Sequence, residues 1–243
     1  MQYNQEEVRI AYMIYRHLYV YGSGMVKEWR EYMYDDKVRS LMEEFAHQDE
    51  AAILAVGETL YLVPLTAQNN MQLTNEYIKK FYMSSDANNI DLYTMYIGII
   101  VFIGCFYDSY ENNKCTRSFI TMGEWLDNIN ERIELLKELD ETTLLAKEKE
   151  LEYNWTKIID FWLALDHWKE KAKRQVGKTK SRMSFLNMTK TFLEKQGLVE
   201  DLGNDELSLT EKAKDIVEKY YMEYEYNRGI LEFLYGLTTK EEE

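Results

Sequence analysis

The stretch that decides the fold is Phe192-Leu-Glu-Lys-Gln-Gly-Leu-Val199, followed shortly by Leu207-Ser-Leu-Thr-Glu-Lys-Ala213. The first part ends an amphipathic helix at Gly197, because glycine adopts the left-handed conformation without a steric penalty. The apolar pair after it starts a strand, and a polar turn at Gly203-Asn204 separates that strand from a second one. Thr210 then has the position of an N-cap. The stretch therefore predicts a helix, a β-hairpin and another helix.

The first third of the chain shows a similar order. Apolar residues recur at helical spacing in three segments, which are residues 5–21, residues 25–34 and the residues from Asp35 or Asp36 onward. Gly22-Ser23-Gly24 ends the first of these helices. Two apolar segments, 52–56 and 59–63, surround a tight turn at Gly57-Glu58 and predict a hairpin. Three helices followed by a hairpin is the order of a winged helix-turn-helix unit.

The first of these helices is expected to pack through one apolar stripe. The stripe consists of Val8, Tyr12, Tyr15 and the adjacent pair Leu18 and Tyr19.

The middle of the chain is predicted to be helical throughout. The segment from Leu92 to Tyr107 is apolar over 16 residues, which is short of the roughly 18 residues that a membrane-spanning helix needs. We interpret it as a buried core helix. Thr121 and Glu124 have the spacing of a capping box that opens a further helix, and a long helix is expected over about 142–174.

The predicted architecture is mainly α with short β-hairpin wings, in the form of tandem winged-helix domains joined by a helical middle. The expected parts are an N-terminal winged helix at 1–66, a helical connector at 67–150 and a C-terminal winged helix at 151–243.

The end of the chain resembles that of many winged-helix domains, in which "GLV" opens the first wing strand and "L-x-LT-x-K-A" closes the second. The order of the whole chain, over roughly 7–225, is similar to that of MukE-like tandem winged-helix subunits of the KITE type, in particular the small subunit of Wadjet-type anti-plasmid systems. The resemblance implies a non-catalytic subunit of an SMC–kleisin complex. Such a subunit forms a homodimer, binds a kleisin-like protein, acts with the SMC ATPase and contacts DNA without sequence preference. No family motif fixes a contact residue.

Positive charge concentrates in one segment of an otherwise acidic chain. The formal net charge is -14, whereas residues 169–195 contain nine basic and two acidic side chains. We predict that this segment, which includes the third helix of the C-terminal unit, contacts DNA phosphates. The predicted DNA-binding residues are Lys173, Arg174, Lys178, Lys180, Arg182 and Lys190. A docking site for an acidic partner and a solvated basic face are the alternatives.

No motif for catalysis, a cofactor or a metal is found. Val176-Gly177-Lys178-Thr179 matches the end of a phosphate-binding loop, but Ala172 stands where the first glycine is needed and a helix is expected before it. His17, His47 and His167 have no carboxylate or cysteine partner at metal-ligand spacing. We therefore expect no enzyme activity, no catalytic residue, no cofactor and no metal site.

The two cysteines, Cys105 and Cys115, form no C-x-x-C pair. No signal peptide is apparent, so the cysteines indicate free thiols in a reducing cytoplasm. We expect no membrane partner.

The main alternative function is a winged-helix transcription regulator. The acidic total charge and the weakly basic first unit count against this alternative. The acidic-to-neutral N-terminal unit is the better candidate for protein contacts.

Overall fold

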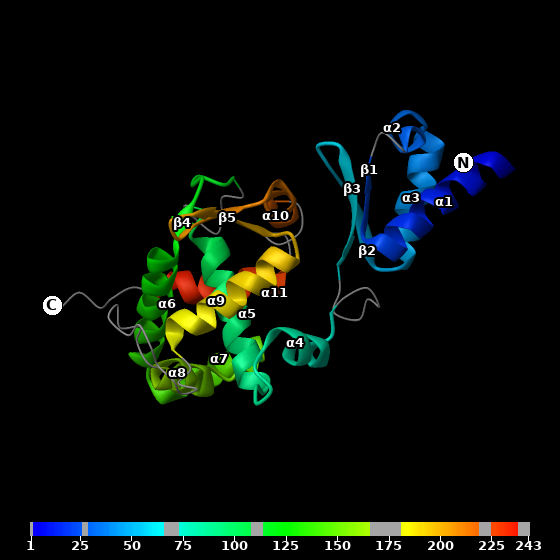
Figure 1. Ribbon diagram of the computed structural model, residues 1–243. Coiled ribbons are helices and arrows are strands. Elements are labelled where there is room, and N and C mark those ends of the chain that lie inside the picture. Colours follow the sequence, from blue (N-terminus) through cyan, green and yellow to red (C-terminus); the bar gives the residue numbers. More distant parts are fainter. Residues whose placement is uncertain are drawn as a thin grey trace. The chain divides into compact units, whose positions relative to one another are not determined.

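The computed structural model describes residues 2–25, 29–65, 73–107, 114–165, 181–218 and 225–237 (Figure 1). The chain is mainly helical and has two small antiparallel sheets. It divides into two compact units, Met1–Thr74 and Asn75–Glu243. The residues predicted as the helical middle and as the C-terminal part lie within the second of these units, apart from 67–74.

The first unit combines helices with one sheet. Its described elements are α1 (Gln5–Tyr21), β1 (Ser23–Met25), α2 (Arg30–Tyr34), α3 (Asp36–Gln48), β2 (Ala51–Val56) and β3 (Thr59–Pro64). The strands lie in the order β1-β3-β2, so the second strand of the hairpin is central. The first and third predicted helices and the hairpin are confirmed. The second helix, predicted at 25–34, is α2 at Arg30–Tyr34 only, and Met25 belongs to β1. The strand β1 was not predicted. Gly22 adopts the left-handed conformation that commonly ends a helix, and this signal does not indicate that a strand follows.

The core of the first unit lies between α1, α3 and the sheet. The buried side chains of α1 are Ala11, Ile14, Tyr15 and Leu18, at helical spacing. They belong to one cluster with Val38 and Met42 of α3 and with Leu60 and Leu62 of β3. The predicted stripe is wrong in part, because Val8, Tyr12 and Tyr19 are exposed.

The second unit is larger and has a helical core with a sheet at its edge. Its described elements are α4 (Asn75–Tyr82), α5 (Asn89–Gly104), β4 (Ile120–Thr121), α6 (Met122–Lys137), α7 (Glu141–Leu151), α8 (Trp155–Ala164), α9 (Arg182–Lys195), β5 (Val199–Gly203), β6 (Glu206–Leu209), α10 (Glu211–Ile216) and α11 (Glu225–Gly236). The strands lie in the order β4-β6-β5.

The apolar helix α5 is the centre of the second unit, as predicted. It packs against α6, α8 and α9, and its residues Met95, Val101 and Phe102 are fully buried. The indole Nε1 of Trp125 on α6 donates a hydrogen bond of 2.9 Å to the carbonyl oxygen of Gly98. Among the helices that the structure describes, none is both long and apolar enough to cross a membrane.

Local signals set several element boundaries as expected. Thr121 and Glu124 form the predicted capping box of α6, and Asp35 is the N-cap of α3. Thr210 caps α10 by accepting from the Ala213 amide at 3.1 Å.

Two predictions for the middle of the chain are corrected. The expected helix over about 142–174 is two helices, because Glu152 adopts a left-handed conformation and Asn154 caps α8 anew. The part of that prediction beyond Leu165 lies outside the described residues. The middle is also not helical throughout, since β4 pairs with β6 through Ile120 and Leu207.

The two units share one succession of elements. In each, a helix leads to a short strand and a second helix, and a later helix is followed directly by a hairpin. In each sheet the short first strand pairs with the second strand of the hairpin. The second unit differs by α4 before α5, by the insertion of α7 and α8 before α9, and by the additional helices α10 and α11 (Figure 1).

Candidate nucleic-acid and partner interfaces

The helices α3 and α9 occupy equivalent positions, because each directly precedes the hairpin of its unit. In helix-turn-helix proteins the last helix of the motif enters the major groove of DNA, and basic side chains beside it contact phosphates. The outward side chains of α3 and α9 and of the two hairpins therefore decide what these units can bind.

Arg182 begins α9 but points into the unit and is only 6% exposed. Its Nε donates to the carbonyl oxygen of Trp162 at 3.1 Å, and its Nη1 donates to Oδ1 of Asn130 at 2.9 Å. The guanidinium also lies 5.6 Å from the centre of the Trp162 ring, and burial lowers its pKa. Arg182 thus joins α6, α8 and α9. The prediction that it contacts DNA is corrected, because its donors are used inside the unit.

Lys190 lies on the same helix, and acidic partners surround it. Its Nζ contacts a carboxylate oxygen of Asp201 on β5 and lies 3.8 Å from Oε1 of Glu194. The side chain is 18% exposed, and the hydrogen bond to Asp201 raises the pKa of Lys190. Because this cation is neutralised within the unit, it offers little attraction to a phosphate.

The other predicted DNA-binding residues, Lys173, Arg174, Lys178 and Lys180, lie outside the described residues. Of the six predicted residues, the structure therefore describes two. Arg182 is buried and Lys190 is paired with acidic groups, and the other four stay a prediction from charge.

The exposed side chains of α9 form a stripe of polar groups, namely Ser184, Asn187, Thr191 and Lys195. The hydroxyl of Thr191 donates to the carbonyl oxygen of Asn187, and the Asn187 amide donates to that of Met183. These groups are thus engaged by the backbone of their own helix. The adjacent hairpin exposes Glu200 and Asp205, which repel phosphates.

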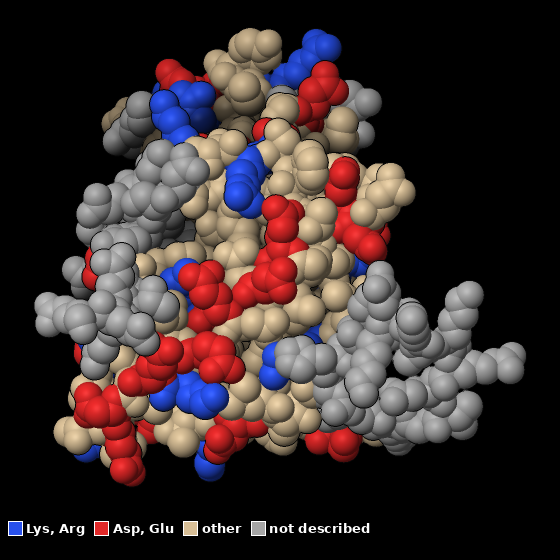
Figure 2. All heavy atoms as spheres, turned by 90° about the vertical axis from the view of Figure 1, so that its left-hand side faces the viewer, with Lys and Arg blue, Asp and Glu red and all other residues tan. Residues whose placement is uncertain are grey.

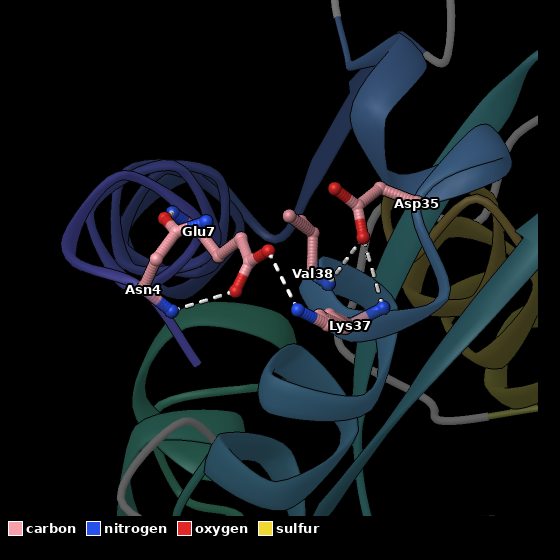
Figure 3. A network of polar contacts seen from close by, with 5 residues as sticks. All are labelled: Asn4, Glu7, Asp35, Lys37 and Val38. Atoms are coloured by element: carbon pink, nitrogen blue, oxygen red, sulfur yellow. Dashed lines mark hydrogen bonds and ion pairs between the residues drawn. The ribbon is translucent and has the colours of Figure 1, made fainter. Parts of the chain in front are cut away.

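The helix α3 has the same lack of available positive charge. Nζ of Lys37 forms an ion pair of 3.0 Å with Oε1 of Glu7 on α1 (Figure 3), and Arg39 pairs with Asp36 one turn before it. Two hydrogen bonds lower the pKa of Glu7: the one from the backbone amide of Asn4 has the larger effect, and the one from Lys37 has the smaller effect. The exposed side chains Glu43 and Glu44 leave the outer side of α3 acidic.

Several side chains of α1 are apolar in spite of their exposure, although the exposed Arg9 and Arg16 lie on the same helix. Val8, Tyr12, Met13, Tyr19 and Val20 are each at least 41% exposed. Exposed apolar side chains that gather on one element indicate a protein contact. The sequence held a signal for this surface, because α1 has more apolar residues than one buried face can take.

Figure 2 shows that the basic and acidic side chains of the described residues in this view are mixed among uncharged ones and form no separate basic region. The second unit also has a cavity of about 540 Å³ whose lining contains both basic and acidic side chains. Three cations, those of Lys114, Arg117 and Lys214, line it together with three carboxylates, those of Glu200, Glu211 and Glu218. It therefore selects neither charge.

Metal-ligand clusters and activated thiols are both absent from the described residues. No group of three or more His, Cys, Asp and Glu side chains among them has the arrangement of a metal site. Both cysteines are free thiols, as predicted. Burial raises the pKa of Cys105 to about 12 and also raises that of Cys115, so both stay protonated and are poor nucleophiles at neutral pH.

A family model described as a family of unknown function, DUF6063, matches residues 1–241. The chain belongs to this family. No curated protein matches the chain. Because the match extends across both compact units, DUF6063 is a family of the two units together.

In this DUF6063 chain the two equivalent helices, α3 and α9, are both short of outward positive charge. Lys195 is exposed at the end of α9, with its Nζ 5.3 Å from the centre of the Tyr82 ring. A phosphate-binding surface on either unit must therefore draw most of its charge from residues beyond these helices.

Proposed function

We propose that the chain is a non-catalytic binding subunit with two winged-helix units. It binds a kleisin-like protein and contacts DNA within an SMC–kleisin complex that acts against plasmids. The observation that carries the proposal is the repeated succession of helix, short strand, helices and hairpin, with the same strand order in both sheets. This is the element order of a winged helix, and two such units in one chain match the tandem arrangement that the sequence resembles.

The DNA contact is assigned to residues 169–180. This segment contains six basic side chains and one acidic one, whereas Arg182 and Lys190 are engaged within the second unit. A short run of cations binds the phosphate backbone with strong salt dependence and no base preference. The polar side chains of α9 are bonded to their own helix, which supports a structural subunit over a transcription regulator.

The protein contacts are assigned to the first unit. Its helix α3 is acidic, which repels DNA, and the exposed apolar side chains of α1 suit a protein surface. We assign the homodimer contact to these side chains of α1.

The first test is co-expression with the products of the neighbouring genes. The chain should co-purify with a kleisin-like protein and an SMC ATPase, and light scattering should show a homodimer of the isolated chain. A monomer that co-purifies with neither protein contradicts the proposal.

The second test is a charge reversal. A variant with Lys173, Arg174, Lys178 and Lys180 changed to Glu should lose binding to duplex DNA at least tenfold, measured by fluorescence anisotropy at two salt concentrations. Arg182 is left unchanged, because its removal would damage the fold. The matched control reverses four exposed lysines of the second unit, Lys80, Lys137, Lys149 and Lys157, and should bind DNA as the wild type does. A large preference between two unrelated duplexes would favour the regulator instead.

A further inference from the structure

The hairpin strand β2 is an outer strand of the first sheet. The strand order β1-β3-β2 places it at an edge, and among the described residues its backbone pairs with β3 alone. Its sequence, Ala51-Ala-Ile-Leu-Ala-Val56, contains no charge and no proline. The register with β3 runs without a bulge over all six residues. An edge of this kind is a template for another strand.

The hydrogen-bond pattern identifies which backbone groups point outward. The amide of Leu65 donates to the carbonyl oxygen of Glu50 at 2.8 Å, which makes these two a hydrogen-bonded pair. Because such pairs alternate in an antiparallel ladder, the even-numbered residues of β2 face β3. The N–H and C=O groups of Ile53 and Ala55 therefore face away from the sheet. Ala55 is also exposed and has the smallest side chain that a strand can bring to a new neighbour.

The equivalent edge of the second unit is protected. Its outer hairpin strand, β5, has the charged residues Glu200 and Asp201 and a register shift between Asp201 and Gly203. Charges and bulges are the devices by which proteins prevent an edge from pairing. Two units with one strand order thus treat the same position differently, and only the edge in the first unit lacks these devices within the described residues.

We propose that β2 binds an extended segment of a partner protein, which adds to the sheet as a fourth strand. Backbone hydrogen bonds to Ile53 and Ala55 would provide the pairing. The core of the segment would be apolar, because it would lie beside Ile53 and Leu54. Its two ends would be basic, because Glu50 and Glu58 are exposed carboxylates at the two ends of β2.

A second copy of this chain fits the edge less well. In an antiparallel pair of two β2 strands, the Glu50 end of each would meet the Glu58 end of the other, and like charges at that distance repel. The occupant is therefore a different protein segment with complementary charge. This inference deepens the proposed function, on which it rests, since it assigns the protein partner to one strand.

The test uses the full chain and a fluorescent nine-residue peptide, Lys-Lys-Val-Thr-Val-Thr-Val-Lys-Lys. Ala55→Pro removes one outward N–H but no bond to β3, which proline at an edge tolerates. It should weaken peptide binding at least tenfold, whereas Ala55→Val, which keeps the amide, should not. Glu58→Lys should weaken binding of this peptide and improve binding of the same peptide with Glu in place of Lys.

Amide hydrogen exchange of the wild type provides a readout that needs no variant. The amides of Ile53 and Ala55 should exchange quickly in the chain alone, whereas those of Ala52 and Leu54 should be protected. Saturating peptide should protect Ile53 and Ala55. Absence of this protection would overturn the proposal, as would protection in the free chain that rises with its concentration, because that indicates a second copy. Co-purification with the neighbouring gene products is a separate experiment. If the peptide test fails and co-purification succeeds, the assignment to β2 is wrong and the proposed function still stands.

Discussion

The two units have the same succession of elements and the same strand order, but they place their charged residues differently. In the second unit the first residue of α9, Arg182, is buried, and the edge strand is charged. In the first unit Lys37, at the equivalent end of α3, forms an ion pair on the surface, and the edge strand is uncharged. The same topology thus carries two different surfaces, so the side chains and not the topology determine what each unit binds.

The largest difference is expected between the two basic residues at the starts of these helices. Arg182→Ala removes a buried side chain and its hydrogen bonds to Asn130 and to the Trp162 carbonyl oxygen, and it should lower the free energy of unfolding by about 2–4 kcal/mol. Lys37→Ala removes a surface pair and should cost about 0.5 kcal/mol or less. Urea unfolding of both variants measures this. An Arg182→Ala variant of full stability that no longer binds DNA would restore Arg182 as a DNA contact.

The next prediction concerns α11, which has no counterpart in the first unit. A Cβ at Gly104 would lie 2.0 Å from the hydroxyl oxygen of Tyr235 on α11, so Gly104→Ala should destabilise the second unit by about 1–3 kcal/mol. At Gly98 of the same helix the nearest atom would be Ile129 Cδ1 at 3.8 Å, and Gly98→Ala should be neutral or stabilise by up to about 1 kcal/mol. Thermal unfolding compares the two. Equal effects would mean that α11 does not pack as described.

The helix caps should behave alike in the two units. Asn4 caps α1 and Thr121 caps α6, each in a capping box. Replacement of either by alanine should cost about 1 kcal/mol, because one backbone N–H loses its acceptor. Denaturant unfolding of the single variants checks this, and a much larger effect of Thr121→Ala would show that its place in β4 matters more than the cap.

The smallest effect on stability is expected from protonation of Asp201 at low pH. Hydrogen bonds from Lys190 and from the Gly203 amide lower the pKa of Asp201, so this group stabilises the fold above its unfolded pKa of about 4 and loses that contribution as the pH falls through the folded value. Asp201→Asn should therefore be less stable than the wild type at pH 7, and the difference should shrink towards pH 3. A difference that is constant with pH would show that the charge of Asp201 is not what matters.

The parts of the fold that were predictable from sequence have local signals. Gly197 and Thr210 indicate the hairpin and the helix after it, and Thr121 with Glu124 fixes the start of α6. The strand β4 was missed because two residues give no period and its pairing partner lies more than 80 residues away. The break between α7 and α8 was missed because no glycine or proline marks it.

The candidate interfaces were less predictable, because charge counts do not show burial. The position of Arg182 depends on Trp162 and Asn130, which come from two other helices. The buried side of α1 was misassigned in part, because Val8 and Tyr12 have the same helical spacing as the buried Ile14 and Leu18. Only the packing of α3 and the sheet decides between them.

One titration tests most directly the claim that the two units divide protein and DNA binding between them. The affinity for a fluorescent duplex is measured for the wild type, for the variant with Lys173, Arg174, Lys178 and Lys180 changed to Glu, and for Ala55→Pro. We predict that the charge-reversed variant loses at least tenfold in affinity and that Ala55→Pro binds DNA as the wild type does. Unchanged binding by the charge-reversed variant would contradict the account, because the second unit would then have no role in DNA binding through this segment.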